Sequence, residues 1–249
     1  MSLADALVEL QELTERLRRE CPWDREQTAR TIVPHTVEEA YEVADAALAE
    51  DDAKLLDEIG DLLFQCVFLS LLLEENARGS LEEAARAVTA KLVRRHPHVF
   101  ADAVEPSTAH AQRERWEELK REQEGREGVF HDVPEGLPAL LYARKVQQRA
   151  KAVGFEYPDL AGAVADLDDE LRELKEDYSG NELGDVLFAA VNVARKLDLD
   201  PELELRAAAK RFRERVEAAE ALAAAEGKDW TTLPLDEQDA YYDQAKERA

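Results

Sequence analysis

The chain has 249 residues, a length that suits one large domain or two domains of about 120 residues, either of which buries a hydrophobic core. It is rich in Ala, Leu, Glu and Arg and poor in Gly and Pro, which favours an all-α protein. The net charge of −24, from 56 acidic and 32 basic residues, argues against nucleic acid and anionic membranes as partners, because like charges repel.

The apolar segments are too short to cross a membrane. The longest, residues 62–73, is interrupted by Gln65 and Ser70 and is shorter than a bilayer requires. Residues 1–20 are amphipathic and carry acidic side chains, unlike a secretory signal. These features predict a soluble, cytoplasmic protein. Cys66, inside the apolar segment, is expected to be a small core residue.

Helices with short connections are predicted throughout the first half of the chain. Leucines recur at helical spacing from Leu3 to Leu17, and Ser80 and Pro97 mark the start and the end of a later helix. The predicted helices cover residues 3–20, 37–50, 53–76 and 81–96. Their short connections favour a helical bundle, and a polar helix is expected further on, around residues 112–120.

The pattern of the first half returns in the second half. Residues 169–173 match residues 38–42, and residues 182–188 match residues 58–64. The two acidic segments are separated by nine residues in the second copy and by sixteen in the first. The helices of the second copy are therefore predicted to be shorter, or the loop between them tighter.

A segment rich in Gly and Pro separates the two copies. It covers residues 125–138 and is the predicted linker. The sequence therefore predicts tandem helical-bundle domains over residues 1–124 and 139–249. No strand-like alternation of apolar and polar residues interrupts the helical pattern of either domain.

The acidic segments of the first copy present pairs of carboxylates. Glu39 and Glu42 are three residues apart, as are Glu58 and Asp61, so each pair lies on one face of a helix. If the two helices pack antiparallel, the carboxylates converge and repel one another unless a cation lies between them. Carboxylate oxygens without Cys or paired His ligands favour Mg²⁺, with Mn²⁺ as a substitute.

These acidic residues also have a structural interpretation. Thr36 and Glu39 have the spacing of a capping box. In a chain with 56 acidic residues, Glu-Glu pairs also occur often on solvent-exposed helix faces. Recurrence of both acidic segments beside an apolar helix in each half favours metal binding. Gly60 and Gly184 lie inside these helices at a cost of up to about 1 kcal/mol relative to Ala, which indicates close approach of a neighbour or ligand.

Basic residues in both halves are candidates for binding phosphate. Lys91, Arg94 and Arg95 cluster near a helix C-terminus, where cations either complement the helix dipole or reach phosphate oxygens. Arg211 and Arg215 are their weaker counterparts in the second half. The two interpretations stay open for both groups.

Three aromatic residues are candidates for stacking on a nucleobase. They are Trp23, Trp116 and Tyr242, and packing is the alternative interpretation for each of them. The sequence contains no Walker loop, no dinucleotide-binding glycine fingerprint and no nucleophile elbow. Binding of a nucleotide would therefore depend on the acidic, basic and aromatic residues described above.

Further motifs accompany the acidic segments. They include the segments Cys-Pro-Trp-Asp at residues 21–24, Arg-Arg-His-Pro-His-Val-Phe at 94–100, Val-Pro-Glu-Gly-Leu-Pro-Ala-Leu at 133–140 and Val-Gly-Phe at 153–155. In combination these motifs resemble the MazG family of nucleoside triphosphate pyrophosphohydrolases, in its two-domain form. The resemblance extends over nearly the whole chain.

This resemblance implies an all-α, Mg²⁺-dependent enzyme that converts (deoxy)nucleoside triphosphates to monophosphates and pyrophosphate, as nucleotide-pool house-cleaning. It also implies a homodimer with bundles completed across subunits. The implied metal ligands are Glu39, Glu42, Glu58, Asp61, Glu170, Glu173, Glu182 and Asp185. Glu38, or Asp169 in the second copy, is a candidate for orienting the attacking water.

The two copies diverge, which leaves other hypotheses open. Asp169 stands where the family motif begins with Glu, and the gap before Glu182 is shorter than in the first copy. One alternative is a non-catalytic regulatory protein that binds nucleotide or metal, with one or both sites degenerate. Another is a plain acidic helical scaffold, which would show no metal-dependent stabilisation.

Overall fold

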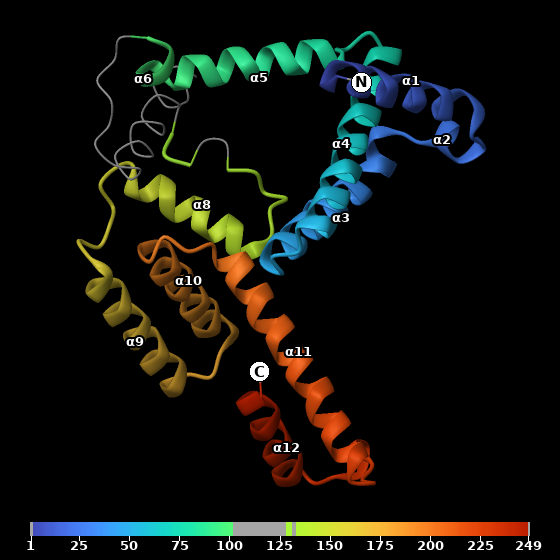
Figure 1. Cartoon of the computed structure of the whole chain (residues 1–249). Helices are drawn as coiled ribbons and strands as arrows, with labels where there is room; N and C mark the ends of the chain where they lie inside the picture. The colour runs from blue at the N-terminus through green and yellow to red at the C-terminus, as the bar shows by residue number, and fades with distance from the viewer. Residues whose placement is uncertain (1, 102–127, 131–132, 249) are drawn as a thin grey trace. The chain divides into compact units, whose positions relative to one another are not determined.

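The computed structural model describes residues 2–101, 128–130 and 133–248 (Figure 1). The regular secondary structure within these ranges is entirely helical, as the composition predicted. The chain divides into two compact units, Met1–Gly125 and Arg126–Ala249, which are described separately. Among the described helices, none has the length and apolar character needed to cross a membrane.

Unit 1 is built on an antiparallel hairpin of two long helices. The helices of this unit are α1 (Leu3–Glu20), α2 (Pro22–Glu26), α3 (Ala29–Leu48), α4 (Asp52–Glu75), α5 (Leu81–Arg95) and α6 (Pro97–Phe100). Helices α3 and α4 pack against each other along the hairpin, and α1 packs on α4 (Figure 1). Ile32 of α3 is buried against Phe68 and Leu72 of α4, so the core lies inside the hairpin.

Helix α3 begins earlier than the sequence predicted. Thr28 is its N-cap and forms a reciprocal capping box with Thr31. Thr36 lies inside the helix, where its hydroxyl donates to the carbonyl of Ile32 at 3.4 Å. The predicted start at residue 37, and with it the capping interpretation of Glu39, is therefore wrong. Pro34 lies within α3, where it removes one backbone donor without ending the helix.

The other elements of unit 1 follow the sequence closely. Helices α1 and α4 have nearly the predicted bounds, and Ser80 caps α5 by accepting from the backbone N–H of Glu83 at 3.2 Å. Cys66 is exposed, which corrects the prediction that it lies in the core. The next residues of α4, Val67 and Phe68, are buried instead.

Unit 2 repeats the helical hairpin. Its helices are α8 (Ala139–Lys151), α9 (Leu160–Glu176), α10 (Gly180–Lys196), α11 (Pro201–Ala225), a 3₁₀ turn at Trp230–Thr232 and α12 (Leu235–Arg248). Helices α9 and α10 form the second hairpin, each with 17 residues against 20 and 24 for α3 and α4, so the predicted shortening is confirmed. Helix α8 packs on α10 and α11, and α12 packs on α11 (Figure 1).

Candidate metal centres

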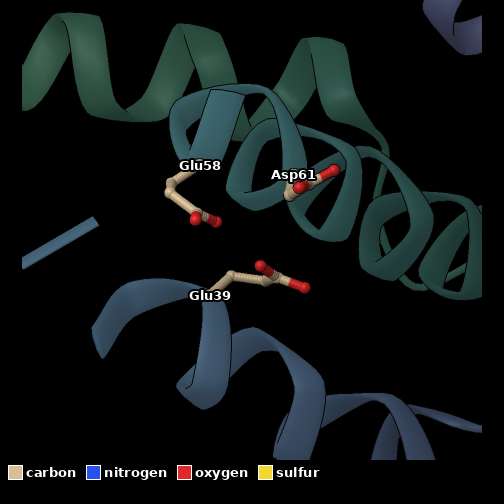
Figure 2. A group of neighbouring side chains, drawn as sticks. All are labelled: Glu39, Glu58 and Asp61. Carbon is tan, nitrogen blue, oxygen red and sulfur yellow. The ribbon is translucent and has the colours of Figure 1, made fainter. Parts of the chain in front are cut away.

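An acidic group in unit 1 joins the two helices of the hairpin. Glu39 comes from α3, and Glu58 and Asp61 come from α4. One carboxylate oxygen from each residue lies within 4.8 Å of the other two, and Figure 2 shows Glu39 reaching from α3 toward the two side chains of α4. Glu58 is only 6% exposed, which is unusual for a carboxylate and requires a compensating charge.

The electrostatics of this group fit a divalent cation. Burial raises the pKa of Glu39, and the negative charges of Asp61, Glu42 and Glu58 raise it further. Burial likewise raises the pKa of Glu58, and its hydrogen bond to Glu42 and the charge of Glu42 add to the effect. A cation that coordinates hard oxygen ligands would relieve this repulsion.

Two further acidic residues of α3 lie beside the group. Glu42 hydrogen-bonds Glu58 and thus adjoins the group without belonging to its three mutually close carboxylates. The side chain of Glu38 is exposed, and its Oε2 lies 3.6 Å from Nδ1 of His35. Both residues therefore lie at the predicted location, next to the acidic group.

Lys54 is a neighbour of the acidic group that sequence reasoning missed. Its Nζ lies 3.6 Å from Oε1 of Glu58, one helical turn away on α4. The spacing of four residues between Lys54 and Glu58 was the available signal. The ammonium group supplies unit 1 with a positive charge inside its own acidic site.

Unit 2 assembles a corresponding group from α9 and α10. The carboxylates of Glu170, Glu173 and Glu182 have oxygens within 4.8 Å of one another. Burial raises the pKa of Glu170, and the charges of Glu173, Asp185, Asp166 and Glu182 raise it further. Asp185 therefore acts on the group electrostatically without being one of its three mutually close carboxylates.

Asn181 is the neighbour that distinguishes the acidic group of unit 2. Its Nδ2 donates to Oδ2 of Asp185 at 3.3 Å and to Oε1 of Glu182 at 3.4 Å. Asn181 also lies four residues before Asp185 on α10, a spacing that could have identified it. The amide carries no charge, so its two hydrogen bonds orient the carboxylates without neutralising them.

The predicted phosphate-binding residues of unit 1 lie on α5. Lys91 and Arg94 are exposed, whereas Arg95 is buried at 8% exposure. Figure 1 shows α5 leaving the C-terminal end of α4, whereas Glu58 and Asp61 lie nearer the N-terminal end. Within unit 1, the fold therefore places these cations on a different helix that leads away from the acidic group.

The corresponding residues of unit 2 lie on α11 and α12. Arg211 is exposed and Arg215 is half-buried. Tyr242 packs against Phe212, with ring centroids 5.8 Å apart, and against the buried cluster that joins α11 to α12. This contact supports the packing interpretation of Tyr242 and leaves base stacking a prediction.

The other candidate aromatic residues are in the first half. Trp116 lies outside the described residues. Trp23, on α2, is 53% exposed and meets the ring of His35 edge-on, with centroids 5.9 Å apart. His35 precedes Glu39 by one turn of α3, so this aromatic contact lies near the acidic group of unit 1.

Comparison with known proteins identifies relatives over nearly the full length. Residues 27–100 match the MazG nucleotide pyrophosphohydrolase domain. The chain is 38% identical over 238 residues to the nucleoside triphosphate pyrophosphohydrolase of Escherichia coli (strain K12), covering 91% of this chain and 90% of that protein. It is 37% identical over 246 residues to the nucleoside triphosphate pyrophosphohydrolase/pyrophosphatase MazG of Thermotoga maritima, covering 96% and 94%. The crystal structure of a mazG-related protein from Thermotoga maritima matches 45% of this chain and 97% of its own, with 30% identity and a TM-score of 0.40.

Proposed function

This chain belongs to the MazG family of nucleoside triphosphate pyrophosphohydrolases, and we propose that its two acidic groups are the metal centres of that activity. The protein hydrolyses nucleoside triphosphates to nucleoside monophosphate and pyrophosphate, the reaction for which its relatives are named. The observation that carries the site assignment is the convergence of three carboxylates from two helices in each unit. Nucleotide-pool house-cleaning in the cytoplasm is part of the proposal.

The donor set of both groups suits Mg²⁺, with Mn²⁺ as a substitute. Glu39, Glu58 and Asp61 would hold the ion in unit 1, with Glu42 adjacent. Glu170, Glu173 and Glu182 would hold it in unit 2, with Asp185 adjacent. When bound, the ion supplies positive charge for the phosphate oxygens and a Lewis acid for water.

The remaining residues act on the substrate and on the water. Glu38 in unit 1 and Asp169 in unit 2 are each exposed beside a ligand, and each would orient a water and accept its proton. The water oxygen forms a bond to the α-phosphorus, the bond from that phosphorus to the bridging oxygen breaks, and pyrophosphate leaves. Arg172 ion-pairs with Asp169 at 2.7 Å and would hold the carboxylate in place.

A homodimer would bring the cations to the acidic groups. Because α5 leads away from the acidic group of its own unit, we assign Lys91, Arg94 and Arg95 to substrate phosphates at a site completed by a second subunit. Leu56, Ile59 and Leu63 form an exposed apolar stripe on α4, and Leu183 and Leu187 form one on α10. Such stripes support burial against a second copy of the chain.

The second unit is proposed to be a MazG-like domain in its own right. Its hairpin repeats that of unit 1, and Glu170 and Glu182 of its acidic group match Glu39 and Glu58 in the repeat. The proposed boundaries stay at residues 1–124 and 139–249, with a linker at 125–138. Arg211, Arg215 and Tyr242 are the proposed substrate-binding residues of this domain, and the net charge of −24 argues against nucleic acid as a partner.

One observation favours a second candidate, in which a unit binds nucleotide or metal without turnover. Lys54 places a positive charge against Glu58 in unit 1, whereas the uncharged amide of Asn181 contacts Glu182 in unit 2. A competing charge of this kind weakens metal binding. Unit 1 is therefore the better candidate for a regulatory site.

Product analysis tests the proposed reaction. The full chain is incubated with a set of (deoxy)nucleoside triphosphates and Mg²⁺, and the products are separated and quantified. Equal amounts of monophosphate and pyrophosphate are expected. Orthophosphate together with the diphosphate, or no turnover with either Mg²⁺ or Mn²⁺, would overturn the assignment. Nucleotide binding by calorimetry without any product would favour the regulatory alternative.

A further inference from the structure

A short segment fastens the open end of the unit 2 hairpin. Glu156, between α8 and α9, accepts from Arg195 Nη1 at 2.7 Å and from Nη2 at 2.8 Å, and lies 2.9 Å from Lys196 Nζ. The Lys196 ammonium also donates to the carbonyl of Tyr157. All three charged side chains are largely buried, with exposures of 9% to 17%. The C-terminal end of α10 therefore fixes the backbone of residues 156 and 157.

Tyr157 connects this fixed backbone segment to α9. A Cβ added at Gly162 would lie 3.4 Å from Cβ and Cδ1 of Tyr157, so the tyrosine ring packs directly on the helix backbone. Its hydroxyl donates to Oδ1 of Asp166 at 2.6 Å, one turn further along α9. Asp166 in turn lies one turn before Glu170, the first carboxylate of the acidic group.

The charges around Tyr157 keep its hydroxyl protonated, so that it can donate a hydrogen bond. The hydrogen bond to Asp166 raises the pKa of Tyr157, and burial and the nearby charges of Asp166, Glu170 and Asp169 raise it further. The phenol is therefore protonated at neutral pH and remains a donor to Asp166. The hydrogen bond to Asp166 places the Tyr157 hydroxyl next to a residue that lies one helical turn before Glu170.

We propose that Tyr157 is a positioning residue for the metal centre of unit 2, holding α9 against α10 so that Glu170 and Glu173 face Glu182 before a cation binds. The proposal rests on the metal role assigned above to this acidic group. Its physical basis is that like charges on two helices repel, so a metal-free site keeps its geometry only if other contacts oppose the repulsion. The turn at residues 177–179 joins the two helices at one end, and the Glu156 and Tyr157 contacts join them at the other.

Unit 1 holds a different contact at the matching position. His35 precedes Glu39 by four residues, as Asp166 precedes Glu170. The contact there is between the rings of Trp23 and His35, 5.9 Å apart, with no hydroxyl-to-carboxylate hydrogen bond. Loss of the Tyr157 hydroxyl is therefore expected to affect unit 2 alone.

The test measures Mn²⁺ affinity directly on the full chain. Glu39→Gln and Glu58→Gln together remove the unit 1 site, and the resulting parent protein is titrated with Mn²⁺ by calorimetry and by electron paramagnetic resonance. Tyr157→Phe in this parent is expected to weaken Mn²⁺ binding by about tenfold, the lower end for loss of an outer-shell partner. The variant removes one oxygen and keeps the ring on Gly162, so it is expected to fold.

Tyr178→Phe is the matched control, because Tyr178 is 85% exposed in the turn of the same hairpin. Its Mn²⁺ affinity is expected to stay within about twofold of the parent, since it removes only a solvated hydroxyl. Asp166→Ala, alone and combined with Tyr157→Phe, completes a double-mutant cycle. Because the phenol acts through Asp166, the combined variant is expected to lose less than the product of the two separate losses.

The outcomes separate the two proposals. A parent that binds Mn²⁺ normally, with a Tyr157→Phe variant of equal affinity, overturns the positioning role and leaves the metal centre standing. A parent that binds no Mn²⁺ overturns the unit 2 metal centre itself. A Tyr157→Phe variant with a lowered melting temperature but unchanged Mn²⁺ affinity shows a merely structural role and also overturns the positioning proposal.

Discussion

Each unit presents a helical hairpin with an acidic group between its two helices, but the two units fasten the open end of the hairpin with opposite charges. In unit 1, Arg18 of α1 forms a bidentate pair with Glu75 at the end of α4, with distances of 2.8 and 3.0 Å. In unit 2, the acid is Glu156 in the preceding segment, and the bases lie at the end of α10. Both units therefore have an ion pair at this end of the hairpin. In unit 1 the base precedes the hairpin and the acid ends its second helix, whereas in unit 2 the acid precedes the hairpin and the bases end its second helix.

The two acidic groups differ in the polar side chains that contact their carboxylates. Lys54 gives unit 1 a local positive charge, and Asn181 gives unit 2 only amide hydrogens. In the absence of metal, unit 2 therefore carries more uncompensated repulsion than unit 1. The comparison predicts that the units respond differently to metal, to acid and to single substitutions.

Removal of one carboxylate from each acidic group should have the largest effect. Glu58→Gln combined with Glu182→Gln is expected to lower turnover by about 1,000-fold or more, because each unit loses a carboxylate that is proposed to hold the catalytic metal. Steady-state assays of the two single variants, Glu58→Gln and Glu182→Gln, measure how much of the turnover each unit contributes. Unchanged turnover in the double variant would show that the acidic groups are not the active sites.

The unit 2 ion pair should contribute more stability than its counterpart in unit 1. Arg195 and Lys196 outweigh the effect of burial and lower the pKa of Glu156 from 4.5 to about 2. Glu156→Gln is expected to lower the free energy of unfolding of unit 2 by about 2 to 3 kcal/mol at pH 7. Glu75→Gln, at a more exposed pair, is expected to cost about 1 kcal/mol.

The stabilisation by Glu156 is expected to depend on pH. Because the folded-state pKa of Glu156 is lowered, its contribution is fully present above about pH 4.5 and is lost as the pH falls toward 2. Urea unfolding of wild type and Glu156→Gln at pH 7 and at pH 3 would measure it. The difference between the two proteins should shrink at pH 3, and a constant difference would contradict the assigned cause.

Replacement of Lys54 should sharpen the contrast between the metal sites. Lys54→Gln removes a charge 3.6 Å from a ligand oxygen of Glu58 and is expected to tighten Mn²⁺ binding in unit 1 by about fivefold. The titration is made in a Glu170→Gln, Glu182→Gln background so that unit 1 alone is observed. The gain should decline at high salt, and a loss of affinity would instead indicate that Lys54 supports the bound state.

The smallest effect is expected when a methyl group is added to α4 at Gly60. Among the described residues, a Cβ at Gly60 meets no atom within 4 Å, so Gly60→Ala is expected to stabilise the helix by up to about 1 kcal/mol. If the adjacent apolar stripe packs against a second subunit, the same change should weaken the dimer in sedimentation experiments. A dimer of unchanged strength would remove close approach as the reason for glycine here.

Local patterns in the sequence predicted most of the helices and pointed to the acidic residues that lie close together in each hairpin. Ser80 predicted the start of α5, and the repeated acidic segments predicted both hairpins. The start of α3 was missed because Thr28 and Thr36 are both plausible caps, and only packing of Ile32 against Phe68 decides between them.

Long-range ion pairs could not be predicted in this way. Arg18 and Glu75 are 57 residues apart, and Glu156 and Arg195 are 39 apart, so no local spacing links either pair. Which three carboxylates in each group lie closest also depends on side-chain rotamers that spacing does not specify. Sequence therefore indicated the members of each site, and tertiary packing determined their arrangement.

The most direct test of the metal assignment is a Mn²⁺ titration of the full chain, with free Mn²⁺ followed by electron paramagnetic resonance. Wild type, Glu39→Gln, Glu170→Gln and the double variant are compared at one ionic strength and pH. We expect each single variant to lose the binding of one unit and the double variant to lose both, because each acidic group is formed by carboxylates of its own unit. Wild-type Mn²⁺ affinity in the double variant would contradict the account.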